Sequence, residues 1–261
     1  MSQPPAFPAE VGGYRIDILV AGYPGKSTQN GGIGWSTVVL LRGHGRVILL
    51  DTGGFGVRKP LMHRLQVLGL TPADVTDLLL SHAHWDHIVN YQLFPQARLY
   101  IGRIEMDWAR SMPPGETAVP EMYVEALSRE PGLTLLEEGD EVFPNLRVEM
   151  GPGHTLGHLV FVLTGDTHDV IFAQDAAKTR AEFVSKRTDM TIDAALSEAT
   201  IEKMWSLLRA REGNILLPGH DLPMILVDGE VRLVGQRDAG ILASFGMSLE
   251  DQTVFDLSAT A

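Results

Sequence analysis

The sequence of 261 residues contains no cysteine. This absence excludes disulfide bonds and thiolate metal ligands, and it fits a reducing compartment, so we expect a cytoplasmic protein. Long apolar runs are also missing, because none approaches the roughly 18–20 residues that a membrane-spanning helix needs. Residues 1–13 have neither a positive cluster nor an apolar core. We therefore expect no membrane segment and no signal peptide.

Positive charge is scarce as well. The chain has 21 lysine and arginine residues against 33 aspartate and glutamate residues, which gives a net charge of −12 at pH 7. Proteins that bind nucleic acid usually neutralise its phosphates with a basic stripe. The only local basic group here lies between Lys178 and Arg187. We therefore expect a small-molecule substrate and no nucleic-acid partner.

The chain does contain a dense group of metal-capable side chains. His82, His84, Asp86 and His87 form the pattern His-x-His-x-Asp-His. Neutral imidazole and carboxylate are ligands that zinc, iron and manganese accept. Packing these four side chains together without a metal would leave several polar groups unsatisfied. The pattern therefore predicts a metal site; the alternative is a chance run on a solvated loop.

Three more candidate ligands follow along the chain. His154 comes after a strand-like run, residues 146–150, and a Gly-Pro-Gly turn. Asp175 and His220 each stand just past a short apolar run that is typical of a buried strand. Binding sites are commonly built where such strands give way to loops on a rigid sheet.

In this order, the seven residues resemble the metal ligands of the metallo-β-lactamase superfamily. Residues 47–54, a strand that ends in Asp-Thr-Gly, and residues 70–81, which lead into the His motif, also look like superfamily segments. The resemblance runs from about Tyr14 to Asp221. It implies an α/β (α+β) fold, a four-layer αβ/βα sandwich in which two mixed β-sheets pack face to face with helices outside.

The resemblance also implies two metal sites. It assigns the first metal to His82, His84 and His154. It assigns the second to Asp86, His87 and His220, with Asp175 as a bridge. The diiron branch of the superfamily usually has Glu at the position of His84, so we expect two Zn²⁺ per chain. Mn²⁺, Co²⁺ and Fe²⁺ remain alternatives, because affinity alone does not choose among these metals.

Such a site predicts a hydrolase. Two cations about 3.5–4 Å apart can share a water and deprotonate it near neutral pH. The bridging hydroxide would open a small carbonyl substrate, which is a lactone, ester, thioester or cyclic amide. Asp86 and Asp175 would be the catalytic carboxylates, with Asp86 carrying a proton to the leaving group. Asp51 either orients a ligand histidine or only forms the turn before Gly53.

The substrate is less specified than the metal site. Ligand set, length and the Gly-His-Asp ending resemble the N-acyl-homoserine-lactonase-like branch, but those lactonases place Tyr where Lys178 stands. Lys178 contacts either the substrate, at an oxyanion, carboxylate or phosphate, or the solvent. Residues 40–99 also resemble small metallo-β-lactamase domain-containing proteins of animals, to which nuclease activity is ascribed. A phosphodiesterase or nuclease is therefore the alternative enzyme, and a non-catalytic metal-binding sensor is the third hypothesis.

Two segments are expected to shape the pocket. Residues 21–35 are rich in glycine and predict a flap, with Tyr23 and Trp35 as substrate contacts. Residues 103–123 carry methionine and aromatic side chains that line a pocket mouth or belong to the core.

The rest of the sequence predicts the order of strands and helices and the extent of the domain. Strands are expected at 14–20, 36–42 and 46–51, and helices at 59–70 and from Thr191 or Asp193 onward. Residues 1–12 are expected to form an extended arm, and residues 13–257 a single domain. The proline-rich arm and apolar strand edges fit a homodimer, and equally a monomer.

Overall fold

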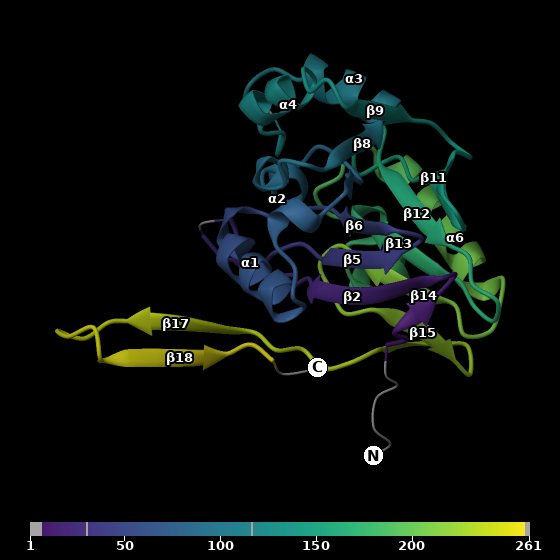
Figure 1. Ribbon diagram of the computed structural model, residues 1–261. Helices are drawn as coiled ribbons and strands as arrows, with labels where there is room; N and C mark the ends of the chain where they lie inside the picture. Colours follow the sequence, from purple (N-terminus) through teal and green to yellow (C-terminus); the bar gives the residue numbers. More distant parts are fainter. Residues whose placement is uncertain (1–6, 30, 116, 259–261) are drawn as a thin grey trace.

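Two seven-stranded β-sheets form the centre of the structure, a computed structural model that describes residues 7–29, 31–115 and 117–258 (Figure 1). The first sheet has the order β1-β2-β5-β6-β7-β8-β9. Its strands are β1 (Glu10–Val11), β2 (Tyr14–Val20), β5 (Val38–Gly43), β6 (Arg46–Leu50), β7 (Asp77–Leu79), β8 (Arg98–Gly102) and β9 (Leu133–Leu136). The sheet is mixed, because β6 to β9 run parallel and the first strands run antiparallel.

The second sheet has the order β10-β11-β12-β13-β14-β15-β16. Its strands are β10 (Glu141–Phe143), β11 (Leu146–Met150), β12 (Leu159–Leu163), β13 (Val170–Gln174), β14 (Ile215–Pro218), β15 (Met224–Val227) and β16 (Glu230–Leu233). Only β13 and β14 pair in parallel, while the other neighbours are antiparallel. This sheet is therefore mixed as well.

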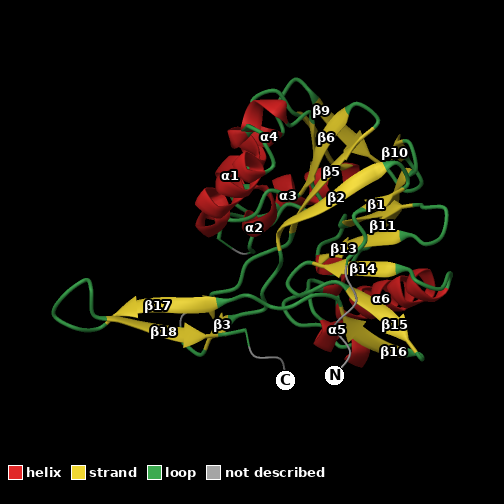
Figure 2. Cartoon of the chain, turned by 60° about the horizontal axis from the view of Figure 1, so that its bottom comes forward, coloured by secondary structure: helices red, strands yellow, loops and turns green. Residues whose placement is uncertain are grey.

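Helices cover the outer face of each sheet (Figure 2). Those of the first half are α1 (Arg58–Val67), α2 (Trp85–Ile88), α3 (Arg103–Ser111) and α4 (Glu121–Leu127), and those of the second half are α5 (Arg180–Ser185) and α6 (Ala194–Arg209). The Asp193 side chain caps α6 by accepting a hydrogen bond from Leu196 N at 3.0 Å. Of the two predicted starting points, Asp193 is thus the one used.

The apolar residues sort into three layers that explain the sandwich. Leu41 and Ile48 of the first sheet pack with Phe161 and Phe172 of the second, so one core lies between the sheets. The other two cores lie between each sheet and its helices. In β6 the side chains alternate, so that Leu49 faces the helices while its neighbours face the second sheet. The predicted four-layer αβ/βα sandwich is confirmed.

Smaller elements lie outside this body. A short pairing of β3 (Lys26–Ser27) with β4 (Gly31–Gly32) lies in the predicted flap, and an isolated bridge joins Tyr23 to Trp35. A separate hairpin, β17 (Gly240–Ser244) with β18 (Gln252–Asp256), projects from the body in both views (Figures 1 and 2). Within the described ranges, no helix has both the length and the apolar character needed to cross a bilayer.

The segment predicted as an N-terminal arm is only partly described. Residues 1–6 of that prediction lie outside the described residues. Glu10 and Val11 pair with Arg15 and Tyr14 of β2, and Val11 is buried in the core between the sheets. Residues 10–11 therefore belong to the first sheet.

The strand ends decide where a site can be built. β6 and β7 are parallel, so the loops that begin at Asp51 and Leu80 leave the first sheet at one edge. β13 and β14 are also parallel, so Asp175 and Gly219 leave the second sheet together. Side chains at the carboxyl ends of adjacent parallel strands meet at one edge, which is where open α/β sheets place their ligands.

The packing of α3 on the loop before β12 gives a test of the fold. A Cβ added to Gly157 would lie 2.0 Å from Glu105 N and 2.5 Å from its Cα, which are backbone atoms of α3. We expect Gly157→Ala to lower the free energy of unfolding by about 1–3 kcal/mol, measured by thermal unfolding followed by circular dichroism. Gly132→Ala is the control, because that Cβ meets no described atom within 4 Å. Equal melting temperatures for the two variants would contradict this packing.

Candidate metal centre

The predicted ligands come together at the edge where the strand ends meet. Seven side chains contribute, from the loop after β7, from α2 and from the loops after β11, β13 and β14: His82, His84, Asp86, His87, His154, Asp175 and His220. Three of their combinations place one ligand atom from each residue within 4.8 Å of the others. Each combination could hold a metal ion.

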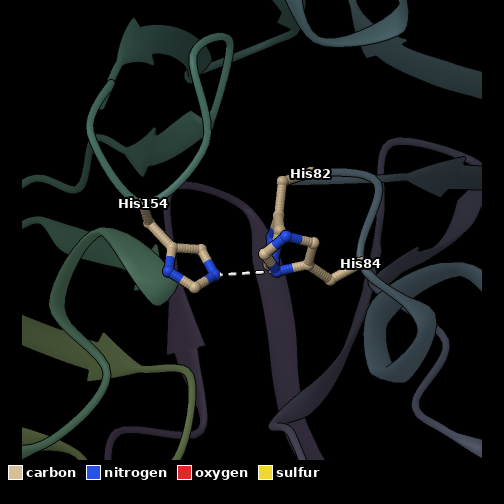
Figure 3. A group of neighbouring side chains, drawn as sticks. All are labelled: His82, His84 and His154. Carbon is tan, nitrogen blue, oxygen red and sulfur yellow. Dashed lines mark hydrogen bonds between the residues drawn. The ribbon is translucent and has the colours of Figure 1, made fainter. Parts of the chain in front are cut away.

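The first combination is His82, His84 and His154 (Figure 3). His154 Nε2 and His84 Nδ1 face each other at 2.9 Å. Two imidazole nitrogens that point at one another need either a proton or a cation between them. All three rings are buried, and a cation shared by the three nitrogens would satisfy them together.

The second combination is Asp86, His87 and His220, and the third joins His87 to His82 and Asp175. His220 Nε2 lies 3.3 Å from Asp86 Oδ2 and 3.4 Å from Asp175 Oδ2. Asp175 also lies between the two histidine groups, because its Oδ2 is 3.2 Å from His154 Nε2 and its Oδ1 is 3.4 Å from His87 Nε2. This is the position that a bridging carboxylate requires.

The unpaired atoms of the cluster test whether a metal fits. His82 Nε2, His87 Nε2 and Asp175 Oδ1 are buried and form no hydrogen bond with any described residue. Ligands held at about 2.0–2.2 Å in a tetrahedron lie about 3.3–3.6 Å apart. The distances from Asp175 Oδ2 to His154 Nε2 and His220 Nε2, 3.2 and 3.4 Å, are close to this range. The donor set of imidazole nitrogens and carboxylate oxygens also suits zinc. The residues therefore fit a metal ion.

The electrostatics of the first group favour neutral rings. Burial lowers the pKa of His84 to about 4, although Asp175 and Asp86 act in the opposite direction. Burial also holds the pKa values of His82 and His154 well below the ordinary value. Histidine coordinates a metal only when deprotonated, so these three rings are already in the ligating form at neutral pH.

The second group attracts positive charge. Burial disfavours a charged ring at His87, but Asp86, Asp175 and Asp51 outweigh this effect and raise its pKa to about 10. The pKa of Asp175 is held well below its usual value, because neighbouring histidines, His220 first among them, outweigh the cost of its burial. The carboxylates thus create a negative potential in which a cation is stable.

Asp51 orients one of the ligands. Its Oδ2 accepts a hydrogen bond from His87 Nδ1 at 2.6 Å, and its Oδ1 accepts one from Ser81 N at 2.8 Å. The bond to Nδ1 leaves His87 Nε2 directed into the cluster. Of the two alternatives for Asp51, the orienting carboxylate is the one that the structure shows.

Two residues beside the cluster have left-handed backbone. Asp51 has φ of 56° and Gln174, immediately before Asp175, has φ of 45°. Residues other than glycine adopt this region at a cost of the order of 1–3 kcal/mol, and such strain is concentrated at functional sites. At Gly219 the constraint is different, since an added Cβ would lie 1.8 Å from Asp175 Oδ1. Only glycine allows the His220 loop to approach Asp175 this closely.

Glu105 is a residue that the sequence analysis missed. It lies on α3, fully buried, and accepts hydrogen bonds from Ala83 N at 2.8 Å, Thr155 Oγ1 at 2.7 Å and Gly157 N at 3.1 Å. Burial raises its pKa to about 7, while these donors act in the opposite direction. Glu105 therefore ties the His82–His84 loop to the His154 loop. A glutamate on an amphipathic helix carries no signal of such a role.

His158 supports the cluster from another side. Its ring is buried and stacks on that of His82 with a centroid distance of 4.8 Å and an interplanar angle of 29°. Burial lowers its pKa to about 3, so the ring is neutral. It forms no hydrogen bond with the described residues through either nitrogen, and its contact with His82 is one of packing.

A cavity of about 720 Å³ opens directly above the ligands. His84, Asp86, His154, Asp175 and His220 line its floor. The size falls within the roughly 300–1,000 Å³ of typical small-molecule sites. A small substrate could therefore reach the ligand cluster from this cavity.

The three predicted substrate contacts differ in their position relative to the cavity. Tyr23 and Lys178 line the cavity, whereas Trp35 is absent from its described lining and stacks behind Tyr23 at a centroid distance of 5.0 Å. Lys178 Nζ forms an ion pair with Glu182 Oε1 at 3.0 Å, and its side chain is only 13% exposed. Lys178 thus lies at the cavity wall instead of extending into solvent.

The flap and the 103–123 segment take different positions. Lys26 of the flap forms an ion pair with Asp189, and both residues line the cavity. From the second segment, Thr117 and Ala118 line the cavity, whereas Met106 and Trp108 belong to the core under the first sheet. Of the two interpretations of the 103–123 segment, core packing holds for Met106 and Trp108.

Comparison with known sequences identifies the family. The sequence profile of the Metallo-beta-lactamase superfamily matches residues 31–220, which include all seven candidate ligands. The chain therefore belongs to this superfamily of hydrolases. The resemblance expected from its motifs is confirmed.

Individual relatives point to two branches. The chain is 29% identical over 187 residues to metallo-beta-lactamase domain-containing protein 1 of Rattus norvegicus, an alignment that covers 71% of this chain and 65% of the rat protein. It is 25% identical over 166 residues to an N-acyl homoserine lactonase of Bacillus thuringiensis, which covers 62% of each protein. The chain thus spans a little less than two thirds of the length of both relatives.

A solved structure shows the same fold. The dizinc quorum-quenching lactonase AidC, in complex with a product, superposes with a TM-score of 0.64 and 19% sequence identity over 87% of this chain and 92% of that protein. At this level of identity the similarity concerns the fold.

The role of Glu105 can be tested by removing one acceptor. In Glu105→Gln an amide NH₂ replaces one carboxylate oxygen and faces a donor instead of accepting from it. An unsatisfied buried donor costs about 1–3 kcal/mol, so we expect a fall of that size in the free energy of unfolding, measured by urea denaturation. Asp107→Asn on the exposed face of α3 is the control and should unfold like the wild type. A wild-type midpoint for Glu105→Gln would contradict the role.

Proposed function

We propose that this protein is a dinuclear zinc hydrolase that opens a small carbonyl substrate: a lactone, ester, thioester or cyclic amide. The observation that carries the proposal is the position of Asp175. Its two oxygens lie 3.2 Å from His154 and 3.4 Å from His87, which belong to different ligand groups. A carboxylate placed between two groups that could each hold a cation supports a two-metal site.

The ligands would divide between two ions. His82, His84 and His154 would hold the first, and Asp86, His87 and His220 the second, with Asp175 shared. When bound, such a pair supplies Lewis acidity and lowers the pKa of a coordinated water. A four-coordinate site that is rich in imidazole ligands favours zinc over other metals.

Asp86 would act on protons as well as on metal. Its Oδ2 lies 3.3 Å from His220 Nε2, while the residue also lines the cavity. A carboxylate in this position can accept a proton at one oxygen and pass it to a leaving group in the cavity. Asp51 would keep His87 in the required tautomer through its hydrogen bond to Nδ1.

The substrate class is supported by the cavity walls. Tyr23, Trp85, Met190 and Ile192 offer apolar surface, and Lys178 is a cation on the same cavity. This combination suits a compact molecule with an apolar part and an electron-rich oxygen. Similarity to an N-acyl homoserine lactonase supports lactones as the first class to examine.

Metal content and turnover test the proposal together. We expect close to two zinc ions per purified chain by elemental analysis, with hydrolysis of at least one of the four carbonyl classes. Asp175→Ala and His154→Ala should abolish turnover with little loss of fold, because each removes a shared or first-group ligand. His63→Ala on the exposed side of α1 is the matched control and should retain activity.

Other outcomes would exclude the proposal. Hydrolysis of bis-p-nitrophenyl phosphate alone would indicate a phosphodiesterase, and no turnover of any class by a chain loaded with two zinc ions would indicate a non-catalytic role. Less than one metal per chain would show that the ligand assignment is wrong.

Lys178 provides a second test, of substrate recognition. Its ammonium would contact the carbonyl oxygen or an anionic group of the substrate. Removing it alone would leave the buried Glu182 carboxylate without its ion-pair partner, so we compare Lys178→Met/Glu182→Gln with Glu182→Gln. We expect kcat/KM to be about 10–100-fold lower in the double variant, a loss of about 1.4–2.7 kcal/mol of transition-state binding. Equal kcat/KM values would show that the ammonium plays no part in turnover.

A further inference from the structure

The hairpin of β17 and β18, which we call the arm from here on and which is distinct from the N-terminal segment, forms a two-stranded sheet of its own among the described residues. Its two strands pair in a continuous register from Gly240–Asp256 to Ser244–Gln252, and neither strand joins another sheet. The arm projects away from the two large sheets in both views (Figures 1 and 2). A two-stranded hairpin is marginally stable in water by itself, so the arm needs another surface against which to pack.

The arm exposes apolar side chains on both faces and at its tip. Seven large ones are exposed: Ile241, Leu242, Phe245, Met247, Leu249, Val254 and Phe255. Phe245 and Phe255, which are 75% and 45% exposed, are the aromatic members of this set, and an aromatic side chain buries about 150–250 Å² when it is fully covered. A stable protein–protein interface buries about 800 Å² on each partner. The exposed side chains of the arm can therefore contribute to an interface of this kind.

The edge of β17 has none of the usual protection against pairing. Natural edge strands carry charged residues, proline or bulges that prevent association. β17 has the sequence Gly-Ile-Leu-Ala-Ser, with no charge and no proline, and its register with β18 has no bulge. The acidic residues of the arm, Glu250, Asp251 and Asp256, all lie on the turn and on β18.

The uncharged edge of β17 permits a second copy of this chain as the occupant. Two copies of a chain with net charge −12 repel each other, and they can approach most readily through an uncharged segment. We propose that β17 pairs with β17 of a second copy, antiparallel across a two-fold axis at Leu242, so that two arms form one four-stranded sheet. In this register Leu242 faces Leu242, and Gly240 faces Ser244 of the other copy. Such self-complementary contact is what two-fold dimers require.

The same geometry places the tip of each arm against the other copy. Because the strands are antiparallel, residues 245–251 extend past the base of the partner arm and reach its body. That base is tied to the cavity wall, since Arg237 forms an ion pair with Asp221, next to His220, and lies over the Tyr23 ring at 6.0 Å. The apolar tip residues would be covered at this place.

The absence of cysteine makes the arrangement directly testable. In the full-length, metal-loaded protein, Leu242→Cys introduces the only thiol of the chain. Directly opposed residues of an antiparallel pair have Cα atoms about 4.5–5.5 Å apart, which is within the range of a disulfide. Val254→Cys is the matched control, because Val254 pairs with Leu242 inside the arm and would lie about 14 Å from its copy, three strand spacings away.

We expect the wild type to sediment as a dimer at micromolar concentration. On mild oxidation, Leu242→Cys should form a disulfide-linked dimer, with at least 10-fold more cross-linking than Val254→Cys. Leu242→Lys, which places two charges face to face, should shift the dimer to monomer, while Val67→Lys on α1 should not. A monomeric wild type would overturn the proposal. A dimer that cross-links through Val254, or through neither cysteine, would overturn it as well.

Discussion

The structure depends on one constraint: imidazole and carboxylate groups that are buried against each other need partners, which a proton or a bound cation would supply. Each ring nitrogen and carboxylate oxygen left without a partner costs free energy in the interior. His82, His87 and Asp175 each retain such an atom among the described residues. The surrounding fold brings these groups together. Parallel strand pairs in both sheets end at the same edge, so the loops that follow them place ligands on two sides of the cluster.

A second set of polar groups makes the site part of the fold. Asp51 at the end of β6 holds Ser81 and His87, and Glu105 on α3 holds the loops that carry His84 and His154. These carboxylates lie on different layers of the sandwich. Displacing a layer would therefore displace ligands, so sheet packing and ligand geometry cannot vary independently. The left-handed backbone of Asp51 is tolerated because its carboxylate is held by three donors.

Local patterns in the sequence were sufficient for the parts of the site that depend on strand ends. The His-x-His-x-Asp-His motif and the turns before His154 and His220 led to residues that do lie together, and the family resemblance supplied the layers of the fold. Glu105 was missed, because its partners are 22 to 52 residues away and a buried glutamate looks like any helix-surface residue. The glycine-rich flap predicts Trp35 as a substrate contact, and the structure adds that its ring stacks on Tyr23, which lines the cavity.

The ligand cluster and the cavity walls therefore depend on different features of the sequence. The ligand cluster follows from short motifs at the ends of rigid strands. The cavity walls instead join segments far apart in the chain, as Lys26 of the flap meets Asp189. Lys178 depends on both features. It lies three residues after the candidate ligand Asp175, and it pairs with Glu182, which lies in the first turn of α5. A lysine held in this way lies at the cavity wall without the freedom of a surface side chain, and this position depends on packing that no short motif contains.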